Sequence, residues 1–305
     1  MLRSIFISLS KSSALRSFVM KNALAQRAAR RFVSGVTLDE ALGPVRELNA
    51  KGILVTMDFL GESVATKPEA LASADEAIRI LEFIQAKGIQ GNVSVKLTQL
   101  GLELGQEFCR DNVARIVDKA KALGNFVRID MEDTPATDRT LEIFYAMLDR
   151  VGPAHVGIVL QSYLYRTEKD AAEVMKRGGR IRLCKGAYKE PASAAFPKKR
   201  DVNANYVKVM KQMLDSGIYH GIATHDENMI RETMAYAEEK KIDRKNFEFQ
   251  MLFGIRRDLQ ERMPKQGYNM RVYVPYGDQW YPYNMRRLAE RPANLFFVLK
   301  NAFRS

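Results

Sequence analysis

Short apolar runs alternate with amphipathic stretches along most of the chain. Each apolar run is β-like in length and composition, and each is followed by a stretch with helical spacing of its apolar residues. Gly88 and Gly124 close two of these helical stretches, as glycine often does. The eight predicted strands cover residues 53–57, 93–97, 126–130, 156–161, 180–184, 221–225, 247–252 and 270–274.

Strands that alternate with helices pair in parallel through right-handed crossovers. Eight such units favour an α/β fold that closes into a (β/α)8 TIM-like barrel, with an open doubly wound sheet as the alternative. The 305 residues suit a single barrel. We therefore predict an N-terminal helical segment over 1–45 and the barrel over 46–305.

The start of the chain has a different composition. The first 38 residues hold seven Lys and Arg, no Asp or Glu, and frequent Ser. Residues 5–33 read as one or two helices, and Thr37 to Glu40 has the pattern of a capping box. A basic segment of this kind is typical of a mitochondrial transit peptide or of an amphipathic helix that touches a membrane.

Net charge and cysteine content limit the possible ligands and the cellular compartment. Lys and Arg exceed Asp and Glu by 48 − 36 = 12, which suggests an anionic ligand, nucleic acid or an anionic membrane surface. Apolar runs are too short to span a membrane. Cys109 and Cys184 lie far apart and have no metal-ligand spacing, so we expect reduced thiols in an intracellular protein.

Polar residues stand in or just after the predicted strands, where a barrel strand would otherwise be apolar. The carboxyl ends of barrel strands form the active-site mouth, so this pattern predicts a site there. The sequence has no dinucleotide-binding glycine motif, P-loop, nucleophile elbow or histidine spacing suited to zinc, and we expect no metal. The polar residues are Lys96, Asp130, Gln161, Arg182, Lys185, His225, Glu248 and Tyr273.

A short helix is predicted after the last strand, over residues 283–291. Tyr283, Arg286 and Arg287 lie at spacings that place them on one face. Paired guanidinium groups suit a carboxylate or phosphate. The alternative is a solvated face on which Arg286 and Glu290 form a surface ion pair.

Seven motifs together resemble the proline dehydrogenase family, most closely its short, single-activity bacterial enzymes. The resemblance runs from about residue 31 to residue 298, in family order. The motifs are Thr56-Met-Asp-Phe-Leu-Gly-Glu62, Ser94-Val-Lys-Leu-Thr98, Arg128-Ile-Asp-Met-Glu-Asp133, Arg182-Leu-Cys-Lys-Gly-Ala-Tyr188, Ala223-Thr-His225, Phe247-Glu-Phe-Gln-Met-Leu252 and Tyr283-Asn-Met-Arg-Arg-Leu288.

The resemblance implies a distorted barrel that holds FAD, with the last helix over the barrel mouth. It also implies oxidation of L-proline to Δ1-pyrroline-5-carboxylate, with hydride transfer to flavin N5 and electrons passed to a membrane quinone. This reaction is the first step of proline catabolism.

On the substrate side, the resemblance assigns a carboxylate clamp and a wall around the proline ring. Arg286, Arg287 and Lys96 would bind the carboxylate, while Tyr273, Tyr283 and Leu252 would surround the ring. Asp130 would lie in the same pocket, and Glu62 would serve as a gate or ion-pair partner of an arginine. Tyr273 would also disfavour hydroxyproline by crowding the ring.

On the cofactor side, the resemblance assigns residues of several strand ends to the flavin. The isoalloxazine region would face Gln161, Arg182 and Lys185, with close backbone approach at Gly186 and Ala187. Thr224 and His225 would hold the adenosine and phosphate part, Lys199 would contact a phosphate, and Glu248 would bind an adenosine-side hydroxyl. Asp130 and Tyr188 are expected in the cofactor site as well.

Partners and location follow from the same resemblance. We expect L-proline, a quinone, and an aldehyde dehydrogenase that takes the product, and no nucleic acid. The location expected is cytoplasmic, with peripheral contact at the inner face of the cell membrane. Two alternatives differ in class: a flavin-free (β/α)8 lyase or isomerase acting on an anionic small molecule, and a nucleic-acid or membrane-binding module driven by the basic N-terminus.

Overall fold

The computed structural model describes residues 31–61, 63–281 and 283. Its strands form one closed, all-parallel barrel in chain order, and β1 pairs with β8 to close it. The strands are β1 (Leu54–Phe59), β2 (Gly91–Val95), β3 (Val127–Ile129), β4 (Val156–Gln161), β5 (Arg180–Cys184), β6 (His220–Ala223), β7 (Phe247–Leu252) and β8 (Asn269–Tyr276).

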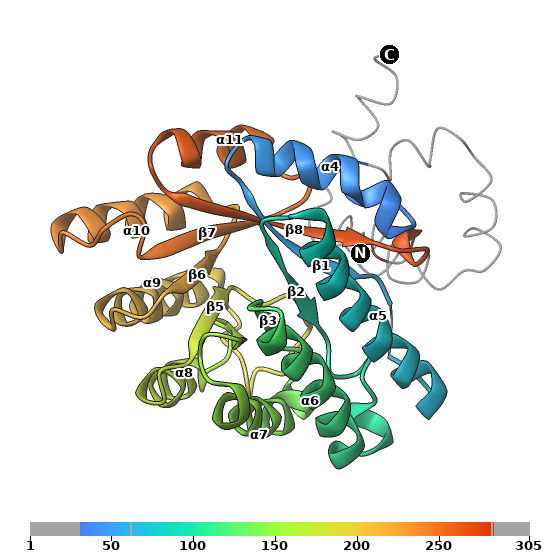
Figure 1. The fold of residues 1–305 in the computed structure, drawn as a ribbon. Helices are drawn as coiled ribbons and strands as arrows, with labels where there is room; N and C mark the ends of the chain where they lie inside the picture. The colour runs from blue at the N-terminus through green and yellow to red at the C-terminus, as the bar shows by residue number, and fades with distance from the viewer. Residues whose placement is uncertain (1–30, 62, 282, 284–305) are drawn as a thin grey trace.

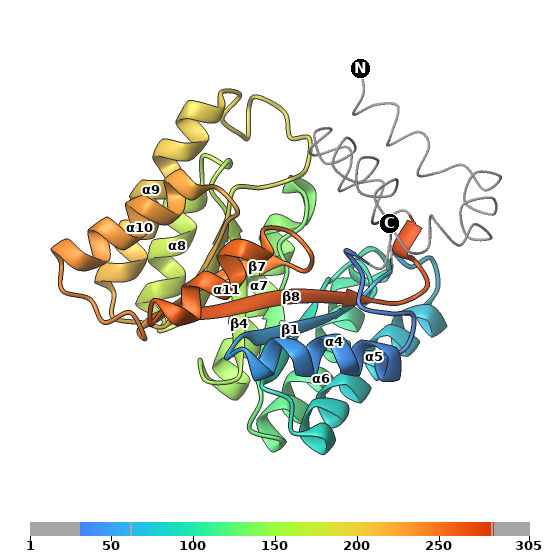
Figure 2. The ribbon, with the colours of Figure 1, turned by 90° about the horizontal axis from the view of Figure 1, so that it is seen from above.

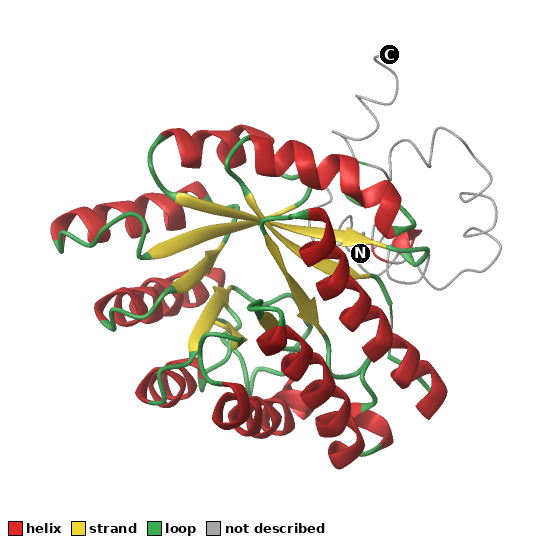
Figure 3. Ribbon diagram, viewed as in Figure 1, coloured by secondary structure: helices red, strands yellow, loops and turns green. Residues whose placement is uncertain are grey.

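Helices surround this barrel on its outside (Figures 1 and 3). They are α4 (Leu38–Ala50), α5 (Lys67–Lys87), α6 (Gln106–Ala122), α7 (Thr134–Val151), α8 (Thr167–Lys176), α9 (Lys199–Asp215), α10 (Glu227–Glu239) and α11 (Arg257–Lys265). A short 3-10 helix, η1 (Leu102–Leu104), precedes α6. The predicted barrel is therefore confirmed, and the open doubly wound sheet is excluded.

Local sequence signals set the helix ends. Thr66 and Glu69 form a complete capping box at the start of α5, and Gly88 ends it in the left-handed conformation. At α4 the expected box is modified. The Thr37 side chain accepts from the Glu40 N–H, but the Glu40 carboxylate accepts from the Val36 N–H instead of that of Thr37.

Pairing around the barrel is uneven. β1 and β8 share six residue pairs, whereas β5 and β6 share two, so the barrel is distorted as expected. Seen from above, β8 crosses the molecule beside β1, its neighbour in the barrel (Figure 2). The main apolar core lies between strands and helices and includes Val55, Val93, Phe144 and Met210.

The predicted boundary after residue 45 falls inside α4, which packs against β1 and β8. The division into 1–45 and 46–305 stays a prediction, and the helices expected over most of 5–33 lie outside the described residues. The helix expected over 283–291 also lies outside them, except for Tyr283. Within the described part of the chain, no helix is both long and apolar enough to cross a membrane.

Candidate active site

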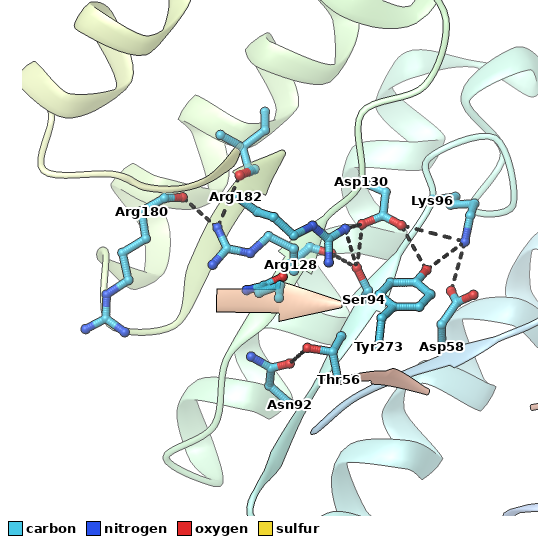
Figure 4. Close-up of polar contacts among 12 residues, drawn as sticks. Thr56, Asp58, Asn92, Ser94, Lys96, Arg128, Asp130, Arg180, Arg182 and Tyr273 are labelled. Atoms are coloured by element: carbon cyan, nitrogen blue, oxygen red, sulfur yellow. Dashed lines mark hydrogen bonds and ion pairs between the residues drawn. The ribbon is translucent and has the colours of Figure 1, made fainter. Parts of the chain in front are cut away.

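A buried polar cluster fills the barrel interior toward the carboxyl ends of the strands (Figure 4). It joins residues from β1, β2, β3, β5 and β8 that are far apart in the sequence. Lys96, Asp130, Arg182 and Tyr273, all predicted from the sequence, lie in mutual contact here. Asp58 and Ser94 complete the cluster.

Lys96 directly follows β2 and links two carboxylates. Its Nζ donates to Asp58 Oδ1 at 2.9 Å and to the Tyr273 hydroxyl at 3.2 Å, and lies 3.7 Å from Asp130 Oδ2. Burial opposes the ammonium charge, but attraction by Asp58 and Asp130 outweighs it and raises the pKa of Lys96. Lys96 is therefore protonated near neutral pH, and 26% of its side chain is exposed.

Asp130 collects donors on both carboxylate oxygens. The Ser94 hydroxyl donates to Oδ1 at 2.5 Å, the Arg182 guanidinium binds the same oxygen, and the Tyr273 hydroxyl donates to Oδ2 at 3.0 Å. Burial opposes ionisation, but the Arg182 and Lys96 charges and the Ser94 and Tyr273 hydroxyls together lower the pKa of Asp130. The carboxylate is therefore ionised and fixed in place.

The pKa values of Tyr273 and Asp58 are raised, in contrast to the lowered pKa of Asp130. Burial, with the nearby Asp130 and Asp58 charges, raises the pKa of the Tyr273 hydroxyl, which remains a neutral phenol. Burial also raises the pKa of Asp58, although the Lys96 ammonium counteracts this. The Arg182 guanidinium lies 5.2 Å from the centre of the Tyr273 ring, a cation–π distance that helps to hold the ring.

A second polar layer lies deeper in the barrel, toward the amino ends of the strands. Glu248 Oε1 accepts from Arg271 Nε at 2.7 Å, and both side chains are almost fully buried. Arg128 donates to the carbonyl oxygens of Ile158 and Arg180. Glu248 thus lies at the start of β7, apart from the cluster at the mouth, and we leave it out of the cofactor site proposed below.

Cationic residues gather at a second place, between β5, α9 and α10. Lys185 Nζ lies 2.6 Å from Asp226 Oδ2 and 2.7 Å from Asn203 Oδ1. Partial burial opposes ionisation, but the Lys185 hydrogen bond, the Asn228 N–H and the Lys185 and Lys199 charges lower the pKa of Asp226. Lys199 is the first residue of α9, and its charge also acts on Asp226.

The loop after β5 lies close to the barrel. Gly186 has a φ of +103°, and a Cβ atom there would lie 2.3 Å from the Tyr163 ring, so only glycine fits. Glu190 fastens the same loop by accepting from the Thr134 N–H at 2.9 Å, at the start of α7. Ala187 follows Gly186 in this loop, and Tyr188 is 42% exposed.

The remaining predicted residues lie at neighbouring strand ends. His225 Nε2 accepts from the Leu252 N–H at 2.9 Å, and Leu252 is paired with Tyr273 in the sheet. Thr224 is buried, and its hydroxyl accepts from the Asp226 N–H at 3.1 Å. The Gln161 side-chain amide donates to the Glu132 carbonyl at 2.7 Å.

Three predicted residues, Glu62, Arg286 and Arg287, lie outside the described residues. Tyr283 is described and buried, and it packs in a cluster with Leu60 and Trp280.

Sequence reasoning did not single out Asp58, Ser94, Asp226 or Glu190. Asp58 was missed because the predicted first strand ended at Met57, whereas β1 continues to Phe59. The available signal was an acidic residue two positions after Thr56, on the same side of the strand. Glu190 and Asp226 lie in loops, where acidic residues are common and give no such signal.

The comparisons with known proteins agree with one another. The model of the family described as proline dehydrogenase matches residues 41–300. Proline dehydrogenase 2 of Bacillus subtilis is 42% identical over 298 residues, which cover 98% of this chain and 97% of the relative. Proline dehydrogenase of Deinococcus radiodurans is 43% identical, over 89% of each chain.

Larger relatives contain a similar barrel as one part. A proline utilization A protein of Bdellovibrio bacteriovorus superposes with a TM-score of 0.82 at 24% identity, which shows the shared fold. The match covers 94% of this chain and 36% of that protein, so the present chain spans about a third of it.

These matches do not support a lyase or isomerase, or a binding module without enzymatic activity. They extend over nearly the whole chain, including the strands that carry the polar cluster. The chain belongs to the proline dehydrogenase family, whose members oxidise proline in proline catabolism.

Proposed function

We propose that this chain oxidises L-proline to Δ1-pyrroline-5-carboxylate with FAD as its cofactor and a quinone as the final electron acceptor. The observation that carries the proposal is the buried cluster of Lys96, Asp130, Arg182 and Tyr273 at the barrel mouth. A stable barrel would fill this space with branched apolar residues, because buried charges are unfavourable. The polar cluster is therefore better explained by a ligand than by folding.

On the substrate side, Lys96 is proposed to bind the proline carboxylate together with Arg286 and Arg287. The Lys96 cation is partly exposed and oriented by its neighbours, which suits a charge-assisted hydrogen bond. Tyr273 and Leu252, paired across β7 and β8, would wall the pyrrolidine ring with Tyr283. Glu62 is proposed as a gate that pairs with one of the arginines.

The Tyr273 hydroxyl has a positioning role in this proposal. It accepts from Lys96 and donates to Asp130, so both of its hydrogen-bonding directions are defined. Because its pKa is raised, the phenol does not act as a base near neutral pH. Its ring instead limits the space beside the substrate, which would disfavour a hydroxylated proline.

On the cofactor side, the described residues fit an anionic dinucleotide. FAD would supply the hydride acceptor for the reaction. Arg182 would face the isoalloxazine region with Gln161, while Lys185 and Lys199 offer two cations to the pyrophosphate. Gly186 and Ala187 bring the backbone close, and Tyr188, Thr224 and His225 would complete the adenosine side.

An absorbance spectrum tests the cofactor. Purified protein should show the visible absorbance bands of an oxidised flavin, and L-proline should bleach them without oxygen. Lys185→Met should lower the flavin-to-protein ratio while the far-UV circular dichroism stays unchanged. A colourless protein that folds and still turns over proline would exclude the flavin.

The quinone and the location rest on the family resemblance and on the basic segment before Asp39. We propose a cytoplasmic enzyme that contacts the inner face of the cell membrane through this segment, and an aldehyde dehydrogenase that consumes the product. Deleting about the first 30 residues should weaken vesicle binding and retain turnover with a soluble dye. Loss of dye-coupled turnover would contradict a purely peripheral role.

A further inference from the structure

The Lys96 ammonium has a defined set of partners. An ammonium group has three donors. One is directed to Asp58 Oδ1 at 2.9 Å and one to the Tyr273 hydroxyl at 3.2 Å, while Asp130 Oδ2 lies farther away at 3.7 Å (Figure 4). Lys96 therefore retains a donor for a ligand on its exposed side.

The two carboxylates near Lys96 differ in their other contacts. Asp130 already receives hydrogen bonds from Ser94, Arg182 and Tyr273. Asp58 Oδ1 accepts a hydrogen bond from Lys96 Nζ at 2.9 Å, and the Asp58 side chain is 2% exposed. Such a buried carboxylate is unfavourable for folding unless it is paired, and here its paired cation is Lys96.

We propose that Asp58 is a positioning residue, which holds the Lys96 ammonium so that its remaining N–H faces the carboxylate of the substrate. This inference rests on the proposed function, in which Lys96 binds that carboxylate. Asp58 is the penultimate residue of β1, and its side chain is 2% exposed, whereas that of Lys96 is 26% exposed.

Asp58 also keeps Lys96 charged. The titratable groups that act on Lys96 in the described part of the chain are Asp58, Asp130, Glu132, Tyr188 and Tyr273, and the Arg182 cation binds Asp130, which it shares with Lys96. Burial is the largest influence on Lys96 and acts against its charge, and Asp58 provides the largest opposing attraction. Without the Asp58 charge, the pKa of Lys96 should fall, and the freed ammonium should turn toward Asp130.

The test measures binding of cyclopentanecarboxylate, which has the carboxylate of proline but no amine that titrates. Isothermal titration calorimetry of the holoenzyme would give its Kd between pH 7 and pH 9.5 for the original chain and for Asp58→Asn. The original chain should vary by less than about threefold, whereas Asp58→Asn should weaken about tenfold or more over this range, as expected when a ligating cation loses its proton.

Two further variants separate this inference from the proposed function. Lys96→Met should bind weakly at every pH, with no added pH dependence. If Lys96→Met binds as tightly as the original chain, the carboxylate role of Lys96 in the proposed function is wrong. If Lys96→Met weakens binding but Asp58→Asn follows the original pH profile and affinity, the role of Asp58 is overturned.

A matched control and a second variant exclude a merely structural effect. Asp118 is an exposed carboxylate 2.7 Å from Arg150, and Asp118→Asn should leave affinity and pH profile unchanged. Asp58→Glu keeps the charge but displaces it by one methylene group. It should weaken binding without the loss at high pH, and an unchanged Kd would overturn the positioning role even if Asp58→Asn does not fold.

Discussion

The Tyr273 hydroxyl donates to Asp130 Oδ2 at 3.0 Å and accepts from Lys96 at 3.2 Å, so one phenol connects a fixed carboxylate to a partly exposed cation. Tyr273 lies in β8, whereas Lys96 directly follows β2 and Asp130 directly follows β3. The three groups meet only because the barrel is closed.

Tyr273→Phe should raise the KM for proline about two- to tenfold, because it removes two hydrogen bonds of ordinary strength and keeps the ring. Steady-state kinetics with an artificial electron acceptor would measure this KM. Tyr219→Phe is the control, since the Tyr219 hydroxyl contacts Glu248 in the deeper layer. An unchanged KM for Tyr273→Phe would show that the Tyr273 hydroxyl does not help to position Lys96.

Arg286→Met or Arg287→Met should raise the KM for proline about 10- to 150-fold, the equivalent of one charge-assisted hydrogen bond. Flavin absorbance should stay unchanged, because neither arginine is proposed to bind the cofactor. Arg110→Met, which removes an exposed guanidinium 3.6 Å from Glu107, serves as the control. Normal turnover at low proline concentration would disprove the clamp.

Gly186→Ala should reduce the flavin-to-protein ratio, because a Cβ would lie 2.3 Å from the Tyr163 ring in a backbone with a φ of +103°. Gly217→Ala is a matched control. Its φ is +70°, but a Cβ there would meet no atom within 4 Å, so it should lower stability by about 1 kcal/mol and retain the flavin. Equal flavin contents in the two variants would contradict a role of this loop in cofactor binding.

Arg271→Met should destabilise the fold by about 3–5 kcal/mol, because it leaves the buried Glu248 carboxylate without its cation. Adding Glu248→Gln should recover part of this loss, as chemical denaturation would show. Flavin content of the folded protein should stay constant in both variants. Loss of flavin from the folded protein would instead indicate that Glu248 belongs to the cofactor site.

His220 should make the free energy of unfolding depend on pH in the acid range. Its Nδ1 accepts from the Ile181 N–H, and its other nitrogen lies 3.0 Å from the Ser216 hydroxyl. Burial, followed by the Arg128 and Arg180 charges, lowers the pKa of His220 to about 3. The neutral ring is thus favoured in the fold, whereas an unfolded histidine binds a proton below a pH of about 6.5.

The stability that depends on neutral His220 is fully present above pH 6.5 and is lost as the pH falls toward 3. At pH 4.5 the loss should be about 3 kcal/mol, from the two pH units below the unfolded pKa. Denaturation between pH 4.5 and pH 7.5 would measure it. His220→Asn keeps an acceptor for Ile181 and should flatten this pH dependence, and an equal slope in both proteins would contradict the assignment.

Much of the fold could be predicted locally. Apolar runs of strand length, the capping signal at Thr37 and closing glycines such as Gly88 predicted the eight strands, and the helices after the first seven of them, in the right order. The ends of the strands were predicted less accurately. The second strand was expected over 93–97 but is Gly91–Val95, because β2 pairs with β1 from Gly91 onward.

The polar positions at strand ends also indicated a candidate site, and four residues of the buried cluster, Lys96, Asp130, Arg182 and Tyr273, were among them, because a buried charge is unfavourable without a partner or ligand. The partners of those charges could not be predicted. Asp58 and Lys96 are 38 positions apart, and Lys96 and Tyr273 are 177 apart. The pairing of β1 with β2 brings Asp58 to Lys96, and the closure of the barrel between β1 and β8 brings Tyr273 to both. Hydrogen bonds and ion pairs depend on these distances in space, which the order of residues along the chain does not contain.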